Sequence, residues 1–187
     1  MNAALAALAV PRSRAVELFS ALLAIACFLR FGLSGEAFVA AFFVSVLVVL
    51  SAIDIERRIL PDRIVLPSAA VVLAANLVLA SDRWAEWAFA PLGAFLFLLA
   101  AALVYPQGMG MGDVKLCLLL GAALGKLVPV ALVLGLAAAL VPSVVLFAVH
   151  GKAGRKMGLP FGPFLAVGAV VALFWGDALL DAYLSTL

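Results

Sequence analysis

Charged residues are scarce in this sequence, and their scarcity defines its class. Of the 187 residues only 12% are charged, whereas 68% are hydrophobic, and the mean hydropathy is +1.30. A soluble domain of this composition has too few polar residues to cover its surface, whereas a lipid bilayer accepts apolar side chains on every side of a helix. The composition therefore excludes an ordinary soluble domain and predicts a membrane protein.

Cysteine and histidine are also rare. The two cysteines, Cys27 and Cys117, lie in apolar runs without C-x-x-C spacing, and His150 is the only histidine. This excludes a disulfide framework and gives no ligand set for zinc, so we expect neither a metal nor another cofactor. The net charge of +2, with basic residues scattered along the chain, argues against nucleic acid as a partner.

Short segments of alternating polarity, which mark barrel strands, are absent, and long apolar runs take their place. A membrane-crossing helix needs roughly 20 apolar residues, with tolerance down to about 17. Six runs meet this requirement: residues 15–31, 37–53, 64–80, 88–105, 127–149 and 159–175. A shorter apolar stretch, 114–125, lies between the fourth run and the fifth.

The basic residues indicate that the short stretch also crosses the membrane, because Lys and Arg accumulate in cytoplasmic loops. With seven crossings and a cytoplasmic N-terminus, nine basic residues fall in the cytoplasm and three outside, whereas without the short crossing the division is six and six. The nine are Arg12, Arg14, Arg57, Arg58, Arg63, Lys115, Lys152, Arg155 and Lys156, and the three are Arg30, Arg83 and Lys126. We therefore expect an all-α, polytopic transmembrane bundle of about seven spans, with residues 1–187 forming one membrane-embedded domain.

Asp54 directly follows the second apolar run. A carboxylate near hydrocarbon is costly, and the last turn of a helix also disfavours negative charge. One interpretation is that Asp54 only ends the span and pairs with Arg57 or Arg58 at helical spacing. The other is that it has a functional role.

Asp113 begins the short apolar stretch, where a helix N-terminus favours a carboxylate. A helix cap is the simple interpretation of such a residue. That interpretation does not explain the three preceding glycines, Gly108, Gly110 and Gly112. Because glycine allows close backbone approach, this loop can fold against other helices or let an extended peptide lie beside the carboxylate.

In the seven-span topology Asp54 and Asp113 reach the same, cytoplasmic face, although 59 positions separate them. Two carboxylates that share a site cannot both ionise cheaply, so one retains a proton. The ionised group can then take a proton from an attacking water while the protonated group donates to a peptide carbonyl. We interpret the two remaining nearby polar residues as a helix cap, Asp62, and an interfacial anchor, Lys115.

Three motifs in this order resemble the type IV prepilin peptidase family, the GxGD aspartic peptidases of bacterial membranes. They are IDIERRILPD at 53–62 followed by LP at 66–67, GMGDVKL at 110–116, and PFGPF at 160–164. The resemblance implies that Asp54 and Asp113 are the first and second catalytic aspartates, with Gly110 and Gly112 in the active-site loop. It also implies a prepilin or pseudopilin substrate, whose basic leader is cleaved at the cytoplasmic face of the bacterial inner membrane.

Larger members of that family carry an N-terminal domain with paired C-x-x-C motifs and N-methylate the new pilin terminus. Here about fourteen residues precede the first apolar run, so the sequence resembles the peptidase-only form of tight-adherence or Flp pilus systems, and no methyltransferase activity is expected. One alternative is an intramembrane peptidase of general transmembrane substrates, which would share the Gly-x-Gly-Asp motif but not the Leu-Pro-Asp turn. Another is a transporter or membrane assembly protein that binds a proton or cation at the aspartates. A transport site belongs near the bilayer midplane, whereas these aspartates are expected at its edge.

Overall fold

The structure, a computed structural model, describes residues 14–104, 110–150 and 160–186, and all regular secondary structure within these ranges is helical. The elements are α2 (Arg14–Phe31), α3 (Gly35–Arg57), α4 (Asp62–Leu79), η1 (Ser81–Arg83), α5 (Trp84–Val104), α6 (Met111–Leu124), η2 (Gly125–Leu127), α7 (Val128–His150) and α8 (Gly162–Leu184). The predicted all-α class is confirmed.

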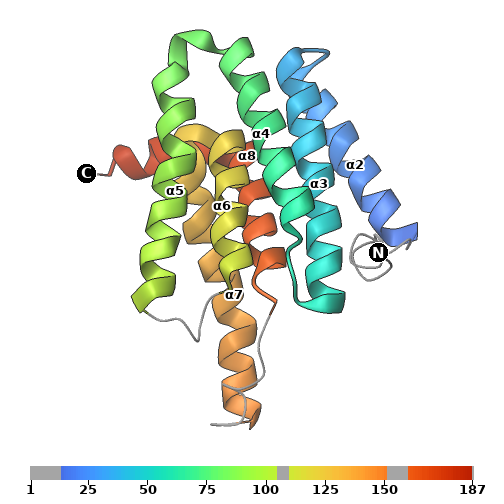
Figure 1. Cartoon of the computed structure of the whole chain (residues 1–187), viewed down its shortest axis with the longest axis vertical. Helices are drawn as coiled ribbons and strands as arrows, with labels where there is room; N and C mark the ends of the chain where they lie inside the picture. The colour runs from blue at the N-terminus through green and yellow to red at the C-terminus, as the bar shows by residue number, and fades with distance from the viewer. Residues whose placement is uncertain (1–13, 105–109, 151–159, 187) are drawn as a thin grey trace.

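The helices run alternately up and down through one bundle (Figure 1). Two contacts show that α4 and α6 are parallel neighbours. The side chains of Lys115 and Asp62 form an ion pair near the first residues of the two helices, and the Asn76 amide donates to the carbonyl of Ala122 near the last residues. Helix α5, which connects them in the chain, runs in the opposite direction on the other side of α6 (Figure 1). At η2 the chain reverses again, so α6 and α7 are separate antiparallel helices, as the short predicted crossing requires.

Five stretches of the described residues are long and apolar enough to cross a membrane, which makes this a multi-pass membrane protein. They are Gly35–Arg57, Asp62–Leu79, Ser81–Val104, Met111–Val145 and Gly162–Leu184. The fourth stretch contains the reversal at η2, and its first part, α6, has 14 residues and a length of about 21 Å. Helix α2 is not among the five, and its 18 residues include Arg14, Glu17 and Arg30.

The described basic residues divide between the two ends of the bundle as predicted. Arg14, Arg57, Arg58, Arg63 and Lys115 lie at the end where α3 finishes and α6 begins, whereas Arg30, Arg83 and Lys126 lie at the other end. The predicted cytoplasmic residues Arg12, Lys152, Arg155 and Lys156 lie outside the described residues. One predicted boundary was wrong, because α8 continues to Leu184 rather than ending near residue 175.

Helices α3 and α6 lie at the centre of the bundle and supply most of its large buried side chains. These include Phe43, Leu47, Leu50 and Ile53 from α3, and Leu116, Leu119 and Leu120 from α6. Many large apolar side chains on the other helices are exposed, such as Leu29 and Val104 with 83% and 86% of their surfaces. Such a surface suits lipid, and the two central helices are the ones that carry Asp54 and Asp113.

Small residues let several helices approach closely. A Cβ atom on Gly121 would collide with the backbone of Pro91 in α5, and one on Gly168 would collide with the backbone of α7 at Ala131 and Gly135. Membrane helices lack a hydrophobic driving force between them and depend on such close packing. These glycines therefore set the separations of α5 from α6 and of α7 from α8.

Candidate active site

Asp54 lies in the last turn of α3, and only 5% of its surface is exposed. The helix ends just beyond it: Arg58 adopts the left-handed conformation, with φ of 55°, and its N–H donates to the carbonyl of Asp54 at 2.8 Å. The carboxylate thus projects from a terminated helix into protein rather than lipid. The positive charge of Arg58 acts on the carboxylate, although these two side chains form no ion pair among the described residues.

The backbone of Gly162 supplies the hydrogen bond to the Asp54 side chain. Its N–H, in the first turn of α8, donates to Oδ2 of Asp54 at 3.0 Å, and both groups are buried. A helix N-terminus favours an anion, so α8 offsets the unfavourable position of Asp54 at the end of its own helix. Glycine is required here because a Cβ on Gly162 would lie 2.8 Å from Oδ2.

Asp113 lies in the first turn of α6 with 9% of its surface exposed. The N–H of Gly110, the residue before the helix, donates to Oδ2 of Asp113 at 3.3 Å. Asp113 therefore caps the helix from its third position rather than from the N-cap position itself. This capping role accounts for one carboxylate oxygen and leaves the other available.

Asp54 and Asp113 lie at the same end of the bundle, Asp54 in the last turn of α3 and Asp113 in the first turn of α6. They are close enough for the charge of Asp54 to act on Asp113 through space. Each carboxylate also lies at a helix N-terminus, Asp54 at that of α8 and Asp113 at that of α6. Two helix dipoles thus favour negative charge at the place where two acidic groups are buried together.

The predicted loop glycines lie where close approach is needed. A Cβ on Gly112 would lie 3.0 Å from the Cβ of Leu60, in the turn between α3 and α4, and one on Gly110 would lie 3.3 Å from Oδ2 of Asp113. Gly112 therefore lets the start of α6 pack against the turn that follows Asp54, and it lies in the first turn of the helix rather than in a loop as predicted. Gly108 lies outside the described residues.

An ion pair that the sequence analysis missed joins the same two segments. Nζ of Lys115 lies 2.6 Å from Oδ2 of Asp62, and the two side chains are 31% and 52% exposed. The predicted cap role of Asp62 was wrong, because the N-cap of α4 is Pro61 and the side chain of Asp62, the first residue of the helix, pairs with Lys115 instead. Because 53 positions separate the partners, no helical spacing could have revealed this contact.

Among the described residues no group of three His, Cys, Asp or Glu side chains is placed to hold a metal ion. The site offers instead a pair of buried carboxyl groups, of which one can act as a base towards water while the other donates a proton. The fold and the site together define a class: a multi-pass helical membrane protein with paired acidic groups at the boundary of its spans.

Comparisons with known proteins identify the family. The family model described as "Type IV leader peptidase family" matches residues 41–151, a segment that includes Asp54 and Asp113. The chain therefore belongs to the type IV leader peptidase family, whose members are aspartic-type proteases. This confirms the resemblance inferred from the three motifs.

Curated relatives agree with that assignment, and each is named prepilin leader peptidase/N-methyltransferase. The protein of Bacillus subtilis (strain 168) is 34% identical over 177 residues, covering 91% of this chain and 68% of the relative. The protein of Xanthomonas campestris pv. campestris is 35% identical, and the alignment covers 90% of this chain and 61% of the relative. The protein of Burkholderia pseudomallei (strain K96243) is 36% identical, and the alignment covers 86% of this chain and 54% of the relative. The chain thus spans 54–68% of the length of these relatives. No solved structure matches it.

Proposed function

We propose that this protein is a prepilin leader peptidase that uses Asp54 and Asp113 as its catalytic pair. Its substrates would be type IV prepilins or pseudopilins, from which it removes the basic leader. The observation that carries the proposal is the burial of these two carboxylates at one end of the bundle, within the segment that matches the leader peptidase family. Residues 1–187 would act as a single membrane-embedded peptidase domain.

The proposed reaction needs only these two groups and water. The ionised carboxylate takes a proton from a water molecule while the oxygen of that water attacks the scissile carbonyl carbon. The protonated carboxyl group donates its proton to the carbonyl oxygen. When the tetrahedral intermediate collapses, the C–N bond breaks and a carboxyl group returns a proton to the departing amine. Gly162 and Gly110 would hold the two carboxylates through their backbone N–H groups, which keeps the acids oriented throughout.

We place the site at the cytoplasmic face of the bacterial inner membrane. Two features support this position: the aspartates lie at the end of the bundle that carries most of the described basic residues, and cytoplasmic loops are rich in Lys and Arg. Location at a bundle end also argues against a transport site, which would lie near the midplane. A cleavage site at this level is reached by the leader of a substrate whose apolar segment remains in the bilayer.

The test is cleavage of a prepilin from the same genome, followed as a shift in size after co-expression. Asp54→Asn and Asp113→Asn each keep the side-chain volume and remove the acid, so each is expected to abolish leader removal while the protein still inserts. The matched control is Asp177→Asn, because Asp177 is exposed and its one ion pair among the described residues is with exposed Lys126 at 3.1 Å, an interaction of little energetic weight. Processing by either active-site variant at the wild-type rate would refute the catalytic pair.

A separate readout addresses methylation. The curated relatives are named for both activities, so the N-terminus of the processed pilin is measured as intact mass after purification from cells that contain this chain as their only leader peptidase. A mass increase of one methyl group, dependent on this chain, shows methylation, and its absence shows cleavage alone. Failure of the wild type to process any prepilin of its genome would favour the transporter alternative.

A further inference from the structure

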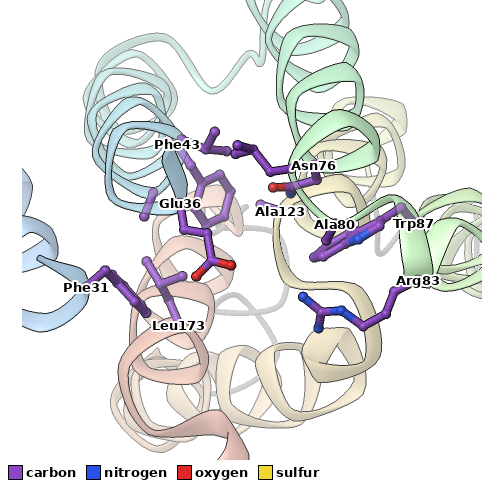
Figure 2. A pocket seen from close by; sticks show the side chains of 12 residues that line it. Phe31, Glu36, Phe43, Asn76, Ala80, Arg83, Trp87, Ala123 and Leu173 are labelled. Carbon is purple, nitrogen blue, oxygen red and sulfur yellow. The ribbon is translucent and has the colours of Figure 1, made fainter. Parts of the chain in front are cut away.

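A cavity lies at the end of the bundle opposite to Asp54 and Asp113. It has a volume of about 130 Å³ and lies among the ends of α2, α3, α4, α5 and α6, beside η1 and the middle of α8. Aromatic and aliphatic side chains such as Phe43 and Trp87 form most of its wall, and three polar side chains enter it: Glu36, Asn76 and Arg83 (Figure 2). Nothing in the proposed peptidase reaction uses these three residues.

Glu36 and Arg83 bring opposite charges to the cavity from opposite sides (Figure 2). Within the described part of the chain no ion pair or hydrogen bond involves the Glu36 carboxylate. Arg83 makes one long contact, 3.9 Å to Glu86, and its guanidinium lies 5.5 Å from the ring centroid of Trp87. Both charged groups thus keep most of their hydrogen-bonding capacity for a ligand.

Asn76 contributes an oriented acceptor. It is 8% exposed, and its amide nitrogen donates to the carbonyl of Ala122 at 2.7 Å, which fixes the side chain with its oxygen towards the cavity (Figure 2). Nearby, the indole N–H of Trp87 is buried without an acceptor among the described residues. A buried polar group without a partner is uncommon in proteins, and a few polar groups that converge in a mostly apolar cavity are the usual lining of a small-molecule site.

We propose that this cavity binds a small zwitterion, the primary-ammonium and phosphate headgroup of a phospholipid such as phosphatidylethanolamine. The ammonium would lie at Glu36 and the Asn76 oxygen, and the phosphate at Arg83. An anion alone would be repelled by Glu36 and a cation alone by Arg83, so a group with both charges fits best. A quaternary ammonium fits less well because it has no N–H to donate to the two acceptors.

Size and position agree with this ligand. The cavity is smaller than the roughly 300–1,000 Å³ of sites for drug-sized ligands, so it suits a headgroup rather than a whole peptide. It lies beside η1, the short turn between two helices that are each apolar enough to span the membrane, which is the level of lipid headgroups. The proposal does not rest on the peptidase activity.

The test is native mass spectrometry of the full chain in detergent, titrated with phosphatidylethanolamine, phosphatidylcholine and phosphatidylglycerol of identical acyl chains. Phosphatidylethanolamine is expected to bind tightest. Glu36→Gln and Arg83→Gln each remove a charged partner and should weaken its binding by about tenfold, the usual scale for a charge-assisted hydrogen bond. The matched controls are Asp82→Asn and Arg30→Gln, whose exposed side chains lie at the same end but do not line the cavity.

Equal binding of the three lipids by the wild type would overturn the proposal, and this comparison needs no variant to fold. Unchanged phosphatidylethanolamine binding in both cavity variants would also overturn it. Competition with free phosphoethanolamine identifies the source of the ligand. Displacement shows that the headgroup alone is recognised, and retention of the lipid shows that its acyl chains contribute, both in agreement with a zwitterion at Glu36 and Arg83.

Discussion

At the scale of single residues, Gly162 carries the tightest steric demand near the proposed catalytic pair. A Cβ there would lie 2.8 Å from the Asp54 carboxylate, which is buried and bonded to the same residue's N–H. Gly162→Ala should therefore displace the carboxylate and lower the rate of prepilin cleavage roughly 100-fold, the scale expected for a misplacement of about 1 Å. A cleavage assay with purified protein measures this rate.

The matched control for that variant is Gly93→Ala, because nothing lies within 4 Å of a Cβ at Gly93 and the change is otherwise identical. Both proteins should insert and purify alike. Equal cleavage by Gly162→Ala and Gly93→Ala would show that the Asp54 carboxylate keeps its position when residue 162 has a Cβ atom.

The candidate site was only partly predictable from the sequence. Asp54 and Asp113 could be chosen because an acid beside an apolar run is costly, and their shared end of the bundle follows from counting spans. The hydrogen bond from Gly162 to Asp54 crosses 108 positions, and the Lys115 pair crosses 53, so neither has a periodic signal. The one hint of the Gly162 contact in the sequence was the position of this glycine between Pro160 and Pro163, at the start of an apolar run.

At the scale of elements, hydropathy located the helices better than it located their ends. Helix α6 was the uncertain case because its 14 residues are short for a crossing, and the charge distribution decided it. Helix α8 runs past its apolar run because Asp177 and Asp181 are compatible with helix once the chain leaves the packed core. Hydropathy measures where a segment prefers lipid, whereas hydrogen bonding decides where the helix ends.

The crossing of α7 and α8 gives a prediction at this scale. A Cβ on Gly168 would collide with backbone atoms of Ala131 and Gly135, which cannot move without separating the helices. Gly168→Ala should lower the stability by about 1–3 kcal/mol, as overpacking does in tightly packed proteins. The midpoint of thermal unfolding in detergent reports the change.

Gly176→Ala is the comparison, since a Cβ there would meet only the flexible end of the Leu127 side chain, at 2.9 Å. It lies on the same helix, so the two variants share any effect of alanine on helix propensity. If both midpoints shifted equally, backbone contact at Gly168 would not be what holds α7 against α8.

At the scale of the whole molecule, the alternation of helices predicts which residues face each side of the membrane. Glu56 lies at the end of the bundle that holds the aspartates, and Ser81 lies at the opposite end, both exposed. In intact cells a membrane-impermeant maleimide should label Ser81→Cys and not Glu56→Cys. The native Cys27 and Cys117 are buried with no exposed surface, so the wild type supplies an unlabelled background.

Lysis is the control, because both introduced cysteines should react once the membrane is permeable. Labelling of Glu56→Cys before lysis would place the aspartates outside the cytoplasm and contradict the proposed sidedness. It would leave the order of the helices unchanged, since that follows from contacts within the bundle.

The hydrogen bond between Gly162 and Asp54 also bears on biogenesis. Both aspartates have been synthesised by residue 113, yet the donor that holds Asp54 belongs to the last helix of the bundle. A nascent chain therefore carries both acids before α8 supplies the donor to Asp54, whereas Gly110, the donor to Asp113, precedes that residue in the chain. On the proposed function, the peptidase would become competent only after α8 has been integrated into the bundle.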